Sequence, residues 1–181
     1  MRDLSLHILD LVENSLRAEA TVIAVTVAAD ARNDRLCVVI EDNGRGLSVT
    51  PEQALDPFFT TKTGKRTGLG LSFFRETAER AGGKLALGCS ELGGVKVAAE
   101  MSLRHIDRSP LGDLAATFAS LVCVSPQVDF RFRLCDGRRE ACLVVREAAK
   151  QQGIDLEDGM ALARLVSGWV RREQSAMQTL T

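Results

Sequence analysis

The chain has 181 residues, enough for one domain with a substantial core and a small additional unit. With 45% hydrophobic residues, 26% charged residues and a net charge of −1, it resembles an ordinary globular protein and not a dedicated nucleic-acid-binding protein. No apolar run approaches the ~18 residues that a membrane span needs, and the N-terminus lacks the apolar core of a signal peptide, so we expect a cytoplasmic protein without a membrane partner.

The cysteines do not have the spacing of a metal site. No Cys-x-x-Cys pair occurs, the number of cysteines is odd, and only two histidines accompany them. We therefore expect buried free thiols at all five positions. These positions are Cys37, Cys89, Cys123, Cys135 and Cys142.

Residues 4–18 have apolar side chains at helical spacing and predict a well-buried helix, with Leu6 widening its apolar surface. Three polar residues, His7, Asp10 and Asn14, fall on one side of this helix. Polar groups on a mostly apolar helix need partners. They form either a structural network or part of a ligand pocket, and the local pattern favours neither.

Two β hairpins are predicted next, with a short helix and a loop at 51–59 between them. The first hairpin pairs 22–28 with 36–40 and ends in Asp42-Asn43-Gly44-Arg45-Gly46. This segment is either a simple tight turn or a site where a carboxylate lies beside backbone that bends sharply. The second hairpin pairs 85–89 with 95–101.

The segment 60–70 is basic and rich in hydroxyl groups and glycine, and a helix follows it that ends before Gly82. Glycine lets backbone approach a ligand closely, and a helix N-terminus offers unpaired N–H groups. Both features suit an anion, so the segment predicts a phosphate-holding loop. Its spacing is not that of a P-loop. The whole order of elements predicts an α/β (α+β) two-layer sandwich with a mixed or antiparallel sheet.

Four segments occur together in the order found in one family, and the chain resembles the ATP-binding module of the GHKL group over about residues 4–103. This group includes DNA gyrase, a heat-shock chaperone, sensor histidine kinases and MutL mismatch-repair proteins. The segments are Leu11-Val12-Glu13-Asn14-Ser15-Leu16, Asp42-Asn43-Gly44-Arg45-Gly46, Asp56-Pro57-Phe58-Phe59-Thr60-Thr61-Lys62 and Gly68-Leu69-Gly70-Leu71. The resemblance implies the Bergerat-type fold, with helices on one face of a mixed sheet, and an ATP-binding domain at 1–103.

The resemblance also implies ATP and Mg²⁺ as ligands and gives roles to particular residues. Asn14 would bind Mg²⁺, and Asp42 would accept a hydrogen bond from the adenine amino group. Asp10 stands where ATP-hydrolysing members have a glutamate, and it is one methylene shorter, which puts hydrolysis in doubt. The remaining implied contacts are to the base for Gly44 and Gly46, and to phosphates for Thr61, Lys62, Gly68, Leu69 and Gly70.

Two departures from sensor kinases matter. Because the first helix is predicted within a few residues of Met1, we expect no dimerising helical hairpin with a phosphoacceptor histidine before it. The later Gly-x-Gly-Thr element appears only as Gly93-Gly94-Val95-Lys96, so Val95 offers no hydroxyl group near Asp42.

Residues 104–181 are predicted as a separate small α+β unit. It contains helices at 114–124 and 155–172, and a hairpin that pairs 128–134 with 141–145. The unit either packs on the ATP module or serves for pairing, for example in a homodimer. Five arginines gather near its hairpin and predict a solvated strand face or, alternatively, a surface for an acidic partner: Arg131, Arg133, Arg138, Arg139 and Arg146. The overall layout is also loosely similar to histidine-kinase-like proteins of bacterial iron-only hydrogenase gene clusters.

Three functions follow as hypotheses. The leading one is a kinase that transfers the γ-phosphoryl group of ATP to a separate partner protein. The second is a non-catalytic regulator in which ATP orders a surface that binds a partner. The third is a slow ATPase with Asp10 as the base.

Overall fold

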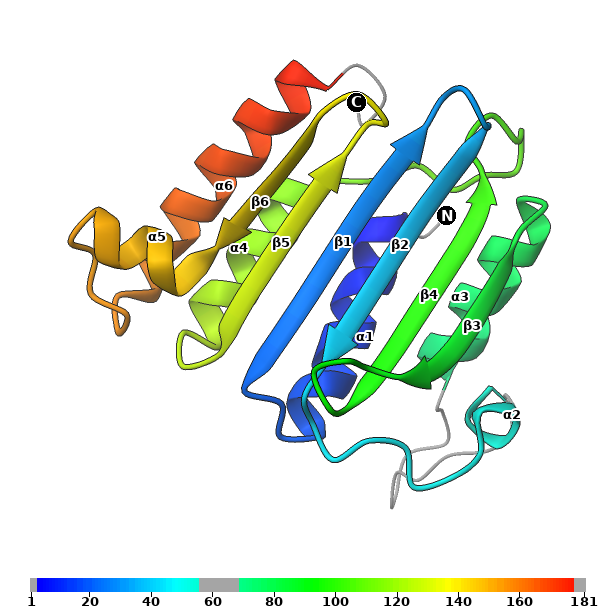
Figure 1. Ribbon diagram of the computed structural model, residues 1–181, viewed down its shortest axis with the longest axis horizontal. Helices are drawn as coiled ribbons and strands as arrows, with labels where there is room; N and C mark the ends of the chain where they lie inside the picture. The colour runs from blue at the N-terminus through cyan, green and yellow to red at the C-terminus, as the bar shows by residue number, and fades with distance from the viewer. Residues whose placement is uncertain (1–2, 56–68, 178–181) are drawn as a thin grey trace.

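A single six-stranded sheet forms the frame of the computed structural model, which describes residues 3–55 and 69–177 (Figure 1). The strand order is β3-β4-β2-β1-β5-β6. Only β1 and β5 run parallel, and every other neighbouring pair is antiparallel, so the sheet is mixed. The strands are β1 (Val22–Asp30), β2 (Arg35–Asp42), β3 (Lys84–Cys89), β4 (Val95–Ser102), β5 (Asp129–Cys135) and β6 (Glu140–Val144).

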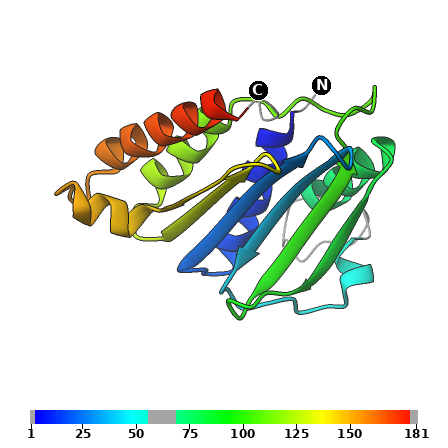
Figure 2. The same ribbon diagram turned by 45° about the horizontal axis from the view of Figure 1, so that its top comes forward.

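The long helices cover one face of this sheet, as Figure 2 shows. This confirms the predicted two-layer sandwich with a mixed sheet and helices on one face. The described helices are α1 (Leu4–Arg17), α2 (Pro51–Ala54), α3 (Leu69–Arg80), α4 (Leu114–Val124), α5 (Val145–Gln151) and α6 (Gly159–Ala176).

The core lies between the sheet and the helices because every second strand residue points toward the helices. In β1, Val25 and Val27 are fully buried, and in β5 the same holds for Phe130. Phe132 of β5 stacks on Phe118 of α4 with ring centroids 4.2 Å apart. The neighbouring strand residues point to the opposite face, which is only partly buried.

The C-terminal segment continues the sheet of the first hundred residues. Val25 of β1 lies opposite Phe132 of β5, and β6 then pairs with β5. Of the two arrangements left open by the sequence, the structure therefore shows this unit packed on the preceding module. The division into domains at residue 103 stays a prediction. No helix in the described ranges is long and apolar enough to cross a membrane.

Two predictions about burial are wrong. Leu6 lies on the outer side of α1 and is 42% exposed, so the apolar surface of this helix is narrower than expected. The five cysteines are free, as predicted, but none is buried. Cys37 illustrates the reason, because it lies between the buried residues Leu36 and Val38 of β2 and so points to the open face of the sheet.

Two predictions about the C-terminal helices also need correction. The last helix begins at Gly159 instead of residue 155, because the side chain of Asp158 accepts a hydrogen bond from Ala161 N and forms the N-cap. The short helix α5 is not predicted by the sequence pattern. It follows β6 directly, and its N-cap residue Val144 makes no side-chain capping bond.

Candidate functional site

The carboxylate of Asp42 lies at the end of β2, where three hydrogen-bond donors converge on it. The Ser15 hydroxyl, from α1, donates to Oδ2 at 2.6 Å. The backbone N–H groups of Gly44 and Val95 donate to Oδ1 at 3.0 and 3.1 Å. Asp42 is only 4% exposed, so a polar group at this depth needs such partners. The three donors fix the orientation of the carboxylate.

Two glycines allow the backbone to approach Asp42. A Cβ atom on Gly94 would lie 2.2 Å from Asp42 Oδ1 and 2.6 Å from the nitrogen of Gly44. A Cβ atom on Gly44 would lie 2.8 Å from the carbonyl oxygen of Ala18. Neither position accommodates a side chain, so the local geometry depends on glycine. Gly46 differs, because it has a φ of +76° and open space around its Cα, and so serves the turn.

Asn43 fixes the turn after β2 to the start of β1. Its Oδ1 accepts hydrogen bonds from the N–H groups of Thr21 and Val22 at 2.8 and 2.9 Å. Its Nδ2 donates to the Thr21 hydroxyl at 2.9 Å. Asp42 is therefore the last residue of a strand whose following turn is anchored to the start of β1. Sequence reasoning assigns Asn43 and Gly94 no role of their own, although both lie within motifs that it identifies.

The N-terminus of α3 lies beside the polar side of α1. A Cβ atom on Gly70 would lie 3.6 Å from the Cβ of Asp10 and 4.0 Å from Nδ2 of Asn14. The structure thus brings together Asp10, Asn14 and Gly70. His7, one turn earlier in α1, is buried, and its ring stacks on Phe74 with centroids 5.1 Å apart.

The amide oxygen of Asn14 already has a partner. Arg17 Nη2 donates to Asn14 Oδ1 at 2.5 Å, and Arg17 Nη1 lies 3.6 Å from the carboxylate of Glu13. Because Asn14 and Ser15 are consecutive in α1, the same helix end contributes both to the contact with Asp42 and to the polar group beside α3. The phosphate-loop residues Thr61, Lys62 and Gly68 lie outside the described residues, and Leu69 begins α3.

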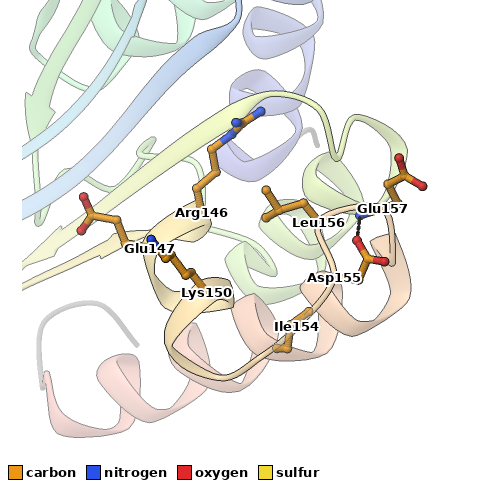
Figure 3. A pocket seen from close by; sticks show the side chains of 7 residues that line it. All are labelled: Arg146, Glu147, Lys150, Ile154, Asp155, Leu156 and Glu157. Atoms are coloured by element: carbon orange, nitrogen blue, oxygen red, sulfur yellow. Dashed lines mark hydrogen bonds between the residues drawn. The ribbon is translucent and has the colours of Figure 1, made fainter.

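A hollow of 630 Å³ lies elsewhere, beside α5 and the loop that leads to α6 (Figure 3). Side chains of both charges line it, among them Arg146, Lys150, Glu147 and Asp155. None of the predicted site residues contributes to this hollow, and among the side chains that line it no buried polar group points to a ligand.

The arginines near the C-terminal hairpin are mostly engaged within the chain. Arg131 pairs with Asp129 at 3.0 Å, and Arg139 pairs with Glu173 at 2.8 Å. Arg133 lies 3.5 Å from Glu140, and Arg146 donates to the Gln127 carbonyl at 2.6 Å. These contacts favour a solvated strand face over a surface for an acidic partner.

Comparison with known proteins identifies the family of the chain and finds solved structures with a similar fold. The family described as histidine kinase-, DNA gyrase B-, and HSP90-like ATPase matches residues 2–105. The virulence sensor protein BvgS of Bordetella bronchiseptica is 26% identical over 133 residues, which are 70% of this chain but only 11% of that protein.

Two solved structures are also similar. The catalytic domain of histidine kinase ThkA is 29% identical, with a TM-score of 0.43, covering 54% of this chain and 65% of the other. The N-terminal domain of a DNA repair protein is 14% identical, with a TM-score of 0.50, covering 78% of this chain and 52% of the other. The second likeness concerns the fold alone. Since the family match spans more than half of the chain, the chain belongs to the histidine kinase-, DNA gyrase B- and HSP90-like ATPases, the GHKL group.

Proposed function

We propose that the chain is a Mg·ATP-binding module that transfers the γ-phosphoryl group of ATP to a separate partner protein. The observation that carries the proposal is the buried Asp42 carboxylate, held by three donors beside two glycines that cannot carry a side chain. A carboxylate fixed in this way presents a defined acceptor to a ligand, which suits recognition of a base by its amino group.

The residues present fit a nucleotide at this end of the sheet. A carboxylate has about four lone-pair positions, and three donors leave one position for an adenine amino group. The backbone of Gly44 and Gly46 would pass close to the base. The phosphates would be held by the N-terminus of α3, with Leu69 and Gly70, and by Thr61, Lys62 and Gly68 before it.

The donor set beside α3 fits Mg²⁺. Asn14 offers an amide oxygen, and Mg²⁺ prefers oxygen ligands and takes few of them from protein when phosphates are present. Arg17 would first have to release Asn14 Oδ1, which it contacts at 2.5 Å. The bound ion would neutralise charge on the phosphates during transfer. Asp10 is the candidate base if water, and not a protein, is the acceptor.

Thermal unfolding with and without Mg·ATP tests the binding step. A ligand at ~100 times its dissociation constant stabilises a protein by about 2.7 kcal/mol, which raises the midpoint by several degrees. We expect this shift in the wild type and its loss in Asp42→Asn, whereas Asp107→Asn, at an exposed carboxylate, keeps it. A wild type that shows no shift at millimolar nucleotide contradicts the proposal.

Incubation with γ-labelled ATP and candidate partner proteins tests the transfer step. Label on a second protein supports a kinase that acts in trans. Release of inorganic phosphate that Asp10→Asn abolishes would instead indicate a slow ATPase. Nucleotide-dependent capture of a partner without label on it would indicate a regulator and contradict phosphoryl transfer.

A further inference from the structure

Among the residues that the structure describes, Ser15 is the only one whose side chain donates a hydrogen bond to the Asp42 carboxylate. The other two donors, Gly44 and Val95, use their backbone N–H groups. Valine has no hydroxyl group, so no second side-chain donor comes from the start of β4. Oδ2 is therefore held by one hydroxyl group, whereas Oδ1 is held by two backbone N–H groups.

The single hydroxyl hydrogen of Ser15 has two acceptors within reach. The carbonyl oxygen of Leu11 lies at 3.5 Å, and Asp42 Oδ2 lies at 2.6 Å. A bond of 2.6 Å to a carboxylate oxygen is short and charge-assisted, whereas 3.5 Å is at the limit of a hydrogen bond. The Ser15 hydroxyl therefore donates its hydrogen to Asp42 and not to the Leu11 carbonyl oxygen. Both residues are buried, so water does not compete freely for this contact.

The distribution of donors over the two carboxylate oxygens is uneven. Oδ1 accepts two N–H groups, and Oδ2 accepts the Ser15 hydroxyl. One lone pair remains on Oδ2. It would accept an N–H group of a ligand and would repel a carbonyl oxygen placed at the same point.

We infer that Ser15 is a specificity-determining residue, which positions Asp42 so that the site selects purine nucleotides with a 6-amino group. The inference rests on the nucleotide-binding function proposed above. Ser15 does not need to touch the nucleotide, because it acts through the orientation of Asp42. Without its hydroxyl, Oδ2 has two open lone pairs in a buried position, and the carboxylate can turn or hold a water molecule instead.

The experiment is a binding titration with two ligands, Mg·ATP and purine riboside triphosphate, in which hydrogen replaces the 6-amino group. The wild type should prefer ATP. We expect Ser15→Ala to weaken ATP binding about 10-fold and to leave the analogue nearly unchanged, so that the preference largely disappears. Ser15→Cys, with a weaker donor of similar size, should give an intermediate preference.

Ser5→Ala is the matched control. Ser5 is also a buried serine of α1, and its hydroxyl donates to a carboxylate, that of Asp3, at 2.7 Å, far along the helix from Asp42. This variant should keep the preference of the wild type. The inference about Ser15 would be overturned if Ser15→Ala weakened the binding of both ligands equally. It would also be overturned if Ser15→Ala and Ser15→Cys both kept the wild-type preference for ATP. Neither outcome would contradict nucleotide binding itself. A wild type that binds neither ligand would instead overturn the proposed function.

Discussion

At the scale of single residues, three segments far apart in the sequence meet around one carboxylate. Ser15 lies in α1, Gly44 in the turn after β2, and Val95 at the start of β4. Their approach is close enough that Gly94, which donates its N–H to the Asp42 carbonyl at 2.9 Å, has no room for a Cβ atom. Adding a single methyl group at Gly94 therefore tests whether this close packing around Asp42 matters for stability and binding.

Gly94→Ala should destabilise the chain and weaken nucleotide binding. The added carbon would lie 2.2 Å from Asp42 Oδ1, so backbone must move, at a cost of about 1–3 kcal/mol in the free energy of unfolding. Denaturant unfolding and the thermal shift with Mg·ATP measure both effects. Gly88→Ala is the control, because nothing lies within 4 Å of the added carbon there, and equal stability of the two variants would contradict the explanation.

Asp34 gives a second prediction at this scale. The hydroxyl of Ser102 and the N–H of Arg104 donate to its carboxylate at 2.6 and 2.9 Å and hold the pKa of Asp34 below its usual range. A lowered pKa in the folded state means that the stabilisation is present above about pH 3.9 and is lost as the pH falls through the folded-state value.

Asp34→Asn should reduce the pH dependence of the free energy of unfolding in this acidic range. Asparagine tolerates the φ of +50° found at residue 34, so the turn keeps its shape. Below about pH 3.9, the free energy of unfolding should fall less steeply in the variant than in the wild type. Parallel pH curves for the two proteins would show that the Asp34 carboxylate does not contribute.

The sequence predicts part of the site and misses its cross-contacts. Asp42 and Gly44 are predicted through the family resemblance, because a carboxylate beside glycines in one short segment also fits a simple tight turn. The Ser15 contact spans 27 residues and depends on how α1 packs on β2, which no local pattern contains. The bond from Arg17 to Asn14 is also invisible in the sequence, because helical spacing brings the two residues near each other without choosing a rotamer.

At the scale of elements, the strands are predicted well because one face of the sheet is buried and the other is not. Alternation of apolar and polar residues along β5 is a direct consequence of that difference. Helix ends depend on finer features. The start of α6 is set by the capping side chain of Asp158, and several acidic residues nearby could have done the same.

Asp158→Ala should therefore lower the free energy of unfolding by about 1 kcal/mol, since Ala161 N loses its partner at the helix start. Asp155→Ala, at the start expected from the sequence, should cost less than half as much, because Asp155 Oδ1 accepts only from Glu157 N in the preceding loop. Urea unfolding of both variants measures the difference. A larger effect at Asp155 would contradict the observed helix start.

At the scale of the whole molecule, the position of β5 decides how independent the first 103 residues are. Removing residues after 105 would leave one edge of β1 unpaired and would uncover the face on which α4 packs. Phe118 and Phe132 would both be missing from the core. The domain boundary suggested by the family resemblance thus runs through a continuous sheet.

We expect a chain truncated after residue 105 to melt at a lower temperature than the full chain and to self-associate through the open edge of β1. Thermal unfolding and size-exclusion chromatography compare the two proteins. A monomeric truncated chain with an unchanged midpoint and an intact shift with Mg·ATP would show that residues 1–103 form an independent domain.

The parallel pairing of β1 with β5 also has a consequence for synthesis on the ribosome. Residue 22 pairs with residue 129, so the partner of β1 is made roughly a hundred residues later. At about 5–20 residues per second, the nascent strand waits on the order of 5–20 seconds with one edge unpaired. During that interval the growing chain offers a binding edge to chaperones, and a ribosome that pauses before residue 129 prolongs the exposure.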